Sequence, residues 1–228
     1  MKKENYLNLT KEFWNKHPCY GQDNFNSREK LRYSLEPWLL KTITKIAENY
    51  SNICEIGCGS GTDGINFCKI LPSHGKYVGI DDSDQSIKLA KNAVEEIKDK
   101  LNIIPVFKVG NAEFLNFEDN SFECIFSFGV IHHTENIQKA VNEIYRVLKP
   151  NGKAYIFIYR KWSPKVTVAK FLRLIQKIFD KVLNTDKCLY KVFKKNVFEK
   201  FLGTMIVECF GVPILNWYNR NDIKFIFR

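Results

Sequence analysis

The chain contains the sequence Ile53-Cys54-Glu55-Ile56-Gly57-Cys58-Gly59-Ser60-Gly61-Thr62, in which a short apolar run leads into three glycines spaced two residues apart. The apolar run predicts a buried strand, and the glycines predict a tight turn that lets the backbone approach a ligand closely. Glu55 would place a carboxylate beneath that turn. A carboxylate there favours a ligand with positive charge or hydroxyl donors over a bare phosphate. Taken alone, the glycine spacing is shared with dinucleotide-binding folds, so the neighbouring segments are needed to identify the ligand.

Strand-like and helix-like segments alternate around this turn. Apolar runs predict strands at 53–56, 77–80, 103–109, 122–128 and 154–159, and helical spacing predicts helices at 62–71, 84–98 and 136–148. The alternation indicates βαβ units in an α/β fold, a Rossmann-like, doubly wound and mostly parallel sheet with helices on both faces. Ligands bind such sheets at the carboxyl ends of the strands. We therefore expect the residues that follow each strand to converge on one cleft.

Three segments of the chain differ in character. Residues 1–50 are predicted to form a helical cap, 51–160 the α/β core, and 161–228 a basic, aromatic-rich helical extension. The net charge of +10 is unevenly distributed, because residues 151–228 hold 16 Lys/Arg and 5 Asp/Glu, while residues 1–150 hold 19 and 20. The basic charge therefore belongs to the C-terminal third, and the two parts are expected to have different partners.

Composition also argues against several classes of protein. The sequence has no uninterrupted apolar run of about 18 residues and a polar N-terminus, so we expect neither a spanning helix nor a secretory signal. Seven cysteines include no C-x-x-C pair, which predicts buried thiols rather than disulfides or a metal site. We expect a cytoplasmic protein without a bound metal, in which contact with a membrane would be peripheral. The sequence does not indicate the oligomeric state.

Polar residues follow the second and third predicted strands. Asp81 lies 24 residues after Gly57, where a carboxylate is placed to accept hydrogen bonds from a ribose diol. The alternative for Asp81 and Asp82 is a turn with a helix cap. Asn111 and Glu113 are placed to meet the edge of an adenine ring, which Phe128 or the backbone beside it would flank; for Asn111 the alternative is a loop cap.

Five ordered motifs resemble those of the class I S-adenosylmethionine-dependent methyltransferases, in the branch that acts on small molecules. They are Glu55-x-Gly57-x-Gly59-x-Gly61, Asp81, Gly110-Asn111-Ala112-Glu113, Phe128-Gly129-Val130-Ile131-His132-His133 and Arg146-Val147-Leu148-Lys149-Pro150-Asn151-Gly152. The resemblance covers about residues 50 to 160. It implies S-adenosylmethionine as cofactor, bound by Glu55, Gly57, Cys58, Gly59, Gly61, Asp81, Asp82, Asn111, Ala112, Glu113 and Phe128.

The sequence departs from the family pattern at two positions. Asn111 stands where the family more often has Asp, which keeps an acceptor and removes the charge. Asn151 replaces the first glycine of a glycine pair. Because Asn tolerates positive φ better than most residues, we expect the turn at Asn151 to survive.

The implied chemistry is an in-line displacement at a sulfonium, in which positioning does much of the catalytic work. A general base is needed only if the acceptor must lose a proton. His133 and His132 are the candidates, since they follow the fourth predicted strand and have a usable pKa range. The alternative for this pair is a structural or gating role.

The acceptor is expected to be a small molecule, including anionic and lipid-like ones. Trp14, Tyr20 and Tyr33 are candidates to close over the cofactor, with core packing as the alternative. The segment 166–183 predicts a helix with an apolar face and a stripe of Lys170, Arg173, Lys177 and Lys181. Three interpretations of it stay open: a packed helix with a solvated face, peripheral contact with an anionic membrane, and docking of an anionic or nucleic-acid substrate.

Other functions remain as alternatives to a small-molecule methyltransferase. The basic third suits an RNA methyltransferase, and the early end of the chain suits an inactive binding module of the same fold. A nicotinamide-dependent dehydrogenase is the least favoured, because no second half of a dinucleotide fold is visible. Relatives carry two final antiparallel strands and a helix near their ends. Clear candidates for both of these strands are missing here.

Overall fold

The computed structural model describes residues 4–18, 24–185 and 212–227. Its centre is a parallel sheet of five strands in the order β3-β2-β1-β4-β5. In chain order these strands are β1 (Asn52–Ile56), β2 (Lys76–Asp81), β3 (Val106–Val109), β4 (Phe122–Phe128) and β5 (Leu148–Phe157). The strand order reverses beside β1, which lies between β2 and β4. The expected α/β fold with a parallel sheet is confirmed.

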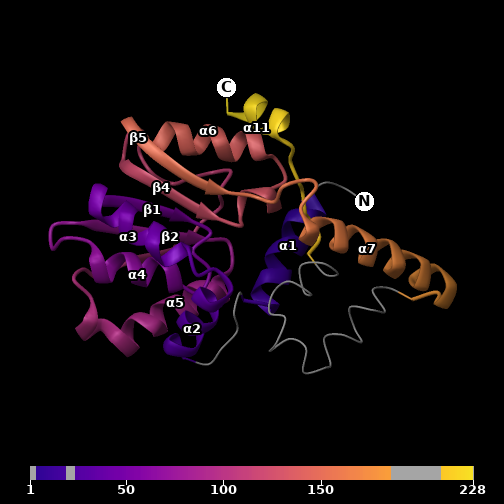
Figure 1. The fold of residues 1–228 in the computed structure, drawn as a ribbon, viewed down its shortest axis with the longest axis horizontal. Helices are drawn as coiled ribbons and strands as arrows, with labels where there is room; N and C mark the ends of the chain where they lie inside the picture. Colours follow the sequence, from indigo (N-terminus) through magenta and orange to yellow (C-terminus); the bar gives the residue numbers. More distant parts are fainter. Residues whose placement is uncertain (1–3, 19–23, 186–211, 228) are drawn as a thin grey trace.

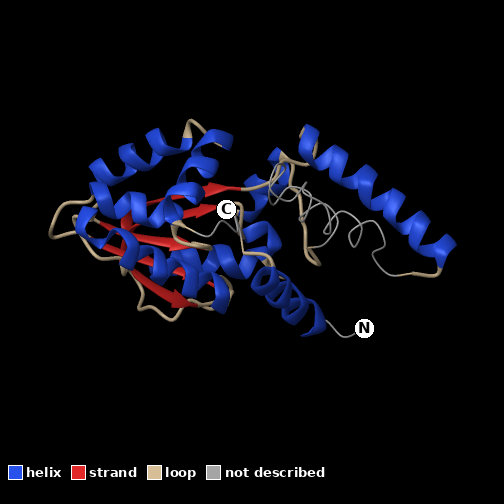
Figure 2. Cartoon of the chain, turned by 90° about the horizontal axis from the view of Figure 1, so that it is seen from below, coloured by secondary structure: helices blue, strands red, loops and turns tan. Residues whose placement is uncertain are grey.

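Helices cover both faces of the sheet (Figures 1 and 2). One face packs on α3 (Leu39–Asn49), α4 (Thr62–Ile70) and α5 (Asp84–Ile97), and the other on α6 (Ile137–Val147) and α11 (Arg220–Ile226). Successive strand residues alternate between the faces. Ile53 belongs to the first core and Cys54 to the second, and both are fully buried. This burial on both faces explains why the strands read as continuous apolar runs.

Further helices stand at the ends of the chain. The N-terminal segment forms α1 (Glu4–Lys16) and α2 (Phe25–Leu35), as the expected helical cap requires. After β5 the chain forms α7 (Pro164–Leu183), two residues longer at its start than predicted. Short 3-10 turns occur at Lys98–Lys100 and Ile131–His133. Among the described residues, no helix is long and apolar enough to cross a membrane.

Two strands begin three or more residues away from their predicted starts. β3 begins at Val106 rather than at 103, because the amides of Asn102 and Ile103 both donate to the Cys68 carbonyl instead of a strand neighbour. β5 begins at Leu148 rather than at 154, since Leu148 already pairs with Phe122 before a register shift. Local patterns do not report such pairings.

Backbone details agree with the sequence in two places. Ser83, which directly precedes the predicted helix 84–98, caps α5 by accepting a hydrogen bond from the Ser86 amide. Asn151 has φ 65°, so it takes the left-handed conformation expected of a glycine replacement. The last described segment bridges to the core at Tyr218, which pairs with Arg160 before α11. Two final antiparallel strands do not occur in the described residues 212–227, which hold this bridge and α11.

Candidate functional site

A cavity of about 300 Å³ lies at the carboxyl ends of the strands. Residues from α1, α2, the glycine loop and the ends of β2, β3 and β4 line it. The lining includes most residues predicted from the sequence, namely Glu55, Gly57, Cys58, Gly59, Asp81, Asp82, Asn111, Ala112, Glu113, Phe128 and His133. Trp14 also lines it, whereas Tyr33 does not, and Tyr20 falls outside the described residues. The expected convergence on one cleft is therefore present.

The backbone amides of the glycine loop donate hydrogen bonds to acceptors within the protein. Gly57 and Cys58 both donate to the Ile80 carbonyl, at 2.7 and 2.9 Å, and Gly61 donates to the Cys58 carbonyl at 2.9 Å. The Gly59 amide donates to Asp81 Oδ2 at 2.9 Å. A phosphate-binding loop needs such amides to be directed at the ligand. This loop uses these four for its own fold, which argues against a pyrophosphate ligand.

Position 57 requires a residue without a side chain. Its φ is +77°, and a Cβ there would lie 2.1 Å from Val130 Cγ2. The loop therefore passes directly against the segment after β4, and only glycine permits both the conformation and the approach.

Gly61 differs from its predicted role. It does not line the cavity, and a Cβ there would meet Ala90 Cβ and Phe107 Cζ, each at 2.8 Å. With φ +79°, Gly61 instead starts α4 and allows close packing onto α5 and β3. The residue serves packing in this structure rather than contact with the cavity.

Glu55 forms the acidic floor of the cavity. Its carboxylate accepts a hydrogen bond from the Tyr77 hydroxyl and is buried. Burial raises its pKa well above the ordinary value, and nearby Asp63 adds to the rise, while the Tyr77 hydrogen bond and Arg32 oppose it. A cationic ligand beside Glu55 would stabilise its charged form. The floor is therefore suited to a positive group.

Arg32 and Asp63 were missed by sequence analysis. Arg32 of α2 donates to Asp63 through Nε at 3.2 Å and Nη2 at 2.7 Å, and both side chains are buried. Tyr33 donates to the same carboxylate at 3.0 Å. Arg32 is the one Lys or Arg among the described residues that line the cavity. The available signal was the helical spacing of Phe25, Arg28 and Arg32, whose side chains are all buried.

Asp81 sits at the end of β2 with both oxygens engaged. Oδ2 accepts from the Gly59 amide and Oδ1 from the Ser83 amide, each at 2.9 Å. Burial raises its pKa to about 6, although these two hydrogen bonds act in the opposite direction. Each carboxylate oxygen accepts more than one hydrogen bond, so Asp81 retains capacity for hydroxyl donors. Burial also raises the pKa of neighbouring Asp82, against the effect of Lys11.

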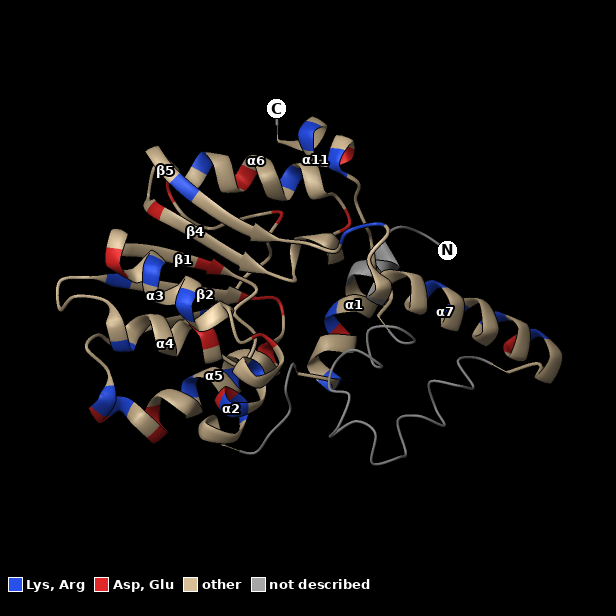
Figure 3. Ribbon diagram, viewed as in Figure 1, with Lys and Arg blue, Asp and Glu red and all other residues tan. Residues whose placement is uncertain are grey.

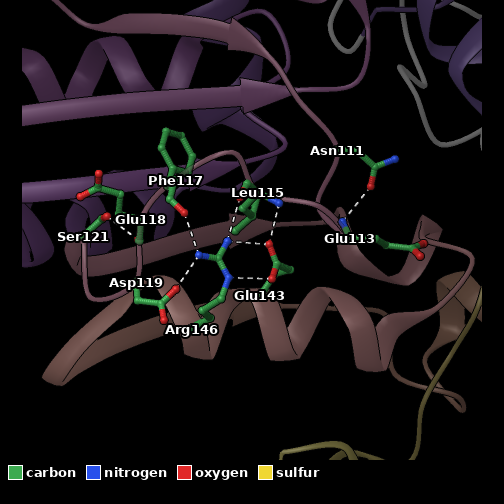
Figure 4. Close-up of polar contacts among 9 residues, drawn as sticks. All are labelled: Asn111, Glu113, Leu115, Phe117, Glu118, Asp119, Ser121, Glu143 and Arg146. Carbon is green, nitrogen blue, oxygen red and sulfur yellow. Dashed lines mark hydrogen bonds and ion pairs between the residues drawn. The ribbon is translucent and has the colours of Figure 1, made fainter.

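The segment after β3 is held by local hydrogen bonds (Figure 4). Asn111 Oδ1 accepts from the Glu113 amide at 2.7 Å. Glu113 Oε1 accepts from the Asn136 amide at 2.9 Å. Arg146 of α6 fixes the following residues by donating to the carbonyls of Leu115 and Phe117. The oxygen of Asn111 thus acts as a loop cap, the alternative interpretation of this residue.

Phe128 lies apart from the Asn111 segment. β4 flanks β1 on the side opposite to β2 and β3, so the two segments stand at different ends of the cavity. The Phe128 ring packs 4.3 Å below the Arg32 guanidinium carbon and 5.2 Å from the Phe157 ring. The strand order therefore does not favour Phe128 and Asn111 on one ligand ring.

Together these features describe one site: an acidic cavity at the switch point of a parallel sheet, beside a glycine loop whose amides are hydrogen-bonded within the protein. Residues 54–156 match the family model described as a methyltransferase domain. The core is a class I methyltransferase domain. This family uses S-adenosylmethionine as the methyl donor.

Curated relatives of this methyltransferase domain include quinone-modifying enzymes. The ubiquinone/menaquinone biosynthesis C-methyltransferase UbiE of Rickettsia prowazekii is 37% identical over 119 residues, which is 51% of this chain and 47% of that protein. The demethylmenaquinone methyltransferase of Lactiplantibacillus plantarum is 33% identical over 121 residues, 51% of this chain and 48% of that protein. The chain thus spans about half the length of the relatives it matches.

Solved structures support the fold of the methyltransferase domain. The YcgJ protein of Bacillus subtilis aligns with TM-score 0.55 and 21% identity over 82% of this chain and 65% of that one. A Haloferax volcanii methyltransferase in complex with its Trm112 activator aligns with TM-score 0.56 and 17% identity, covering 96% and 75% of the two chains.

The cavity of the methyltransferase domain fits a sulfonium nucleoside. S-adenosylmethionine carries a sulfonium, an ammonium and a ribose diol, and its one acidic group is a carboxylate. The lining offers several carboxylates and, among its described residues, one guanidinium. This set of groups matches that ligand better than it matches a dinucleotide.

The two histidines of the methyltransferase domain are placed differently. His133 lines the cavity, and its Nδ1 lies 2.7 Å from the Ile214 carbonyl oxygen. Because a carbonyl only accepts, Nδ1 is the protonated nitrogen in the neutral ring and Nε2 carries the lone pair. His132 is fully buried outside the lining, with its ring 4.1 Å from that of Tyr159. The geometry therefore favours His133 over His132 as a base.

Proposed function

We propose that the protein is an S-adenosylmethionine-dependent methyltransferase whose acceptor is a small, lipid-like molecule. The observation that carries the proposal is the acidic cavity beside a glycine loop whose amides donate to acceptors of the protein itself and not to a ligand. The match of residues 54–156 to the methyltransferase domain family supports it independently.

The roles we propose for the donor side follow from charge. Glu55 stabilises the ammonium and Arg32 the carboxylate of the methionine part, since they are the acidic floor and the guanidinium of the described lining. Asp81 accepts from the ribose hydroxyls. Ala112 and its neighbours Asn111 and Glu113 lie against adenine at the β3 end of the cavity.

On the acceptor side, we propose that His133 and the aromatic rings near it position the molecule to be methylated. The Trp14 and His133 rings lie 5.4 Å apart, and Tyr159 also lines this end. The bound cofactor supplies an electrophilic methyl group. Positioning the acceptor for in-line attack can contribute most of the rate, and His133 is the proposed base where the acceptor must lose a proton.

The lining favours an uncharged acceptor over RNA. Glu36, Glu55, Asp63, Asp81 and Asp82 all line the cavity, and such a set repels phosphodiesters. Two relatives are named for ubiquinone/menaquinone biosynthesis and for demethylmenaquinone, and such quinone compounds support an acceptor of this class.

Transfer of radiolabel tests the proposed activity. Purified protein with methyl-labelled S-adenosylmethionine should place label in the solvent-extractable lipid fraction of a cell lysate, and Asp81→Ala should reduce that label strongly. Label in RNA instead would support the alternative substrate. Cofactor binding without label in any fraction would show an inactive binding module and contradict the proposal.

A further inference from the structure

The helix α7 stands away from the sheet, beyond the carboxyl ends of β4 and β5 (Figures 1 and 2). It begins at Pro164, five residues after Tyr159 of the cavity lining. On one side of the helix, Val166, Ala169 and Gln176 are buried, and Arg173 Nη2 donates to the Val212 carbonyl at 3.1 Å. The opposite side is largely exposed.

That outer surface is apolar. Phe171, Leu174, Ile178 and Val182 recur every three or four residues and are exposed by 62%, 56%, 54% and 75%. Val168, Phe179 and Leu183 broaden the stripe, and each is about half exposed. Globular proteins rarely expose a continuous apolar stripe of this length unless another surface covers it. The predicted apolar face is therefore largely exposed, although its Leu172 and Ile175 are partly buried.

Positive charge runs along one edge of this stripe. At 100° per residue, Lys170, Lys177 and Lys181 fall together beside Leu174, while the one acidic residue of the helix, Asp180, falls opposite the stripe. Figure 3 shows Lys and Arg at intervals along α7. Long lysine side chains at such an edge can place their charges at lipid headgroups while the apolar residues enter the acyl boundary.

Aromatic rings mark the start of the helix. Lys170 Nζ lies 5.1 Å from the ring centre of Trp162 and 4.4 Å from that of Trp217, and Trp162 is largely exposed. Exposed tryptophan beside lysine is typical of the headgroup region of a bilayer.

We propose that α7 lies on an anionic membrane surface, with the stripe Phe171, Leu174, Ile178 and Val182 inserted among the lipids. The charge complementarity of the lysine edge selects an anionic bilayer over another apolar protein face. Because α7 follows directly on the end of the cavity lined by Tyr159, docking would bring that end to the lipids. An acceptor of the proposed lipid-like class would then reach the site from the membrane.

Vesicle flotation tests this surface with the full chain. Vesicles of phosphatidylcholine with about one quarter phosphatidylglycerol should carry the protein upward, and pure phosphatidylcholine vesicles should carry much less. Phe171→Glu/Ile178→Glu should weaken binding at least about tenfold, as should Lys177→Gln/Lys181→Gln. Tyr145→Glu, on the far side of the sheet and 83% exposed, should leave binding unchanged.

Docking does not require methyl transfer, so the two proposals fail separately. The double variants should keep the wild-type affinity for S-adenosylhomocysteine, which reports the cofactor site alone. Absence of flotation, or flotation that the Phe171→Glu/Ile178→Glu variant retains, would overturn the inference. A dimer in light scattering that this variant dissociates would assign the face to a second copy of the chain and likewise overturn it.

Discussion

The carboxyl edge of the sheet and the helix α7 are built from similar apolar residues used in opposite ways. At the sheet edge the apolar side chains are buried, and carboxylates line a cavity beside a tight glycine loop. In α7 the apolar side chains face outward beside lysines. The first arrangement depends on a few atoms in fixed positions, whereas the second depends on the composition of a surface. Single substitutions should therefore damage the two regions very differently.

The largest effect is expected at the buried ion pair of Arg32 and Asp63, which lines the cavity. Arg32→Met leaves the Asp63 carboxylate buried without its guanidinium, which should lower the free energy of unfolding by about 3–5 kcal/mol. Lys69→Met is the matched control, since the Lys69–Glu29 pair is as short, at 2.6 Å, but more exposed. The control should lose less than about 1 kcal/mol in urea titration. Equal losses would show that the Arg32 pair does not depend on burial.

A smaller loss is expected at the glycine loop. Gly57→Ala forces an alanine to φ +77° and a Cβ against Val130, so we expect a loss of about 2–4 kcal/mol of unfolding free energy. Gly129→Ala separates the two causes, because Gly129 has φ +75° while a Cβ there would meet none of the described residues within 4 Å beyond its chain neighbours. That control should cost about 1 kcal/mol by thermal or urea unfolding. A Gly57→Ala variant as stable as the control would contradict the close approach.

The smallest effect is expected on α7. Phe171→Ala removes a side chain that is mostly exposed, so the free energy of unfolding should change by less than about 0.5 kcal/mol. Phe126 is fully buried on β4, between β1 and β5, so Phe126→Ala should lower the free energy of unfolding by several times more. A large loss at Phe171 would mean that the apolar stripe is covered within the folded chain.

Most of the fold could be predicted, because strand and helix periods alternate clearly from residue 53 onward. The errors fall where tertiary pairing overrides local pattern, as at Leu148, whose early pairing with Phe122 extends β5. Asn102 shows the same effect, since its amide turns to the Cys68 carbonyl before β3 begins.

The site was predictable where it depends on strand ends. Asp81 and the residues after β3 come to the cavity because parallel strands end at one edge. The spacing of Phe25, Arg28 and Arg32 indicates the buried face of α2, but no local pattern shows that Arg32 pairs with Asp63, 31 residues away. Gly61 and His132 were included in the predicted site because they belong to the same motifs as residues that line the cavity. In the structure neither of them lines it.

Calorimetry with S-adenosylhomocysteine tests the account most directly. The wild-type protein should bind with micromolar affinity near pH 8, and Asp81→Ala should lose about 1–3 kcal/mol. Because burial raises the Asp81 pKa to about 6, the carboxylate protonates below that pH, and wild-type affinity should fall about tenfold per unit under pH 6. Asp81→Asn should lack the part of this pH dependence that comes from Asp81, whereas any part that comes from Glu55, whose pKa is also raised by burial, should remain. Folded wild-type protein that gives no binding heat, or an Asp81→Ala variant with unchanged affinity, would contradict the cofactor site described here.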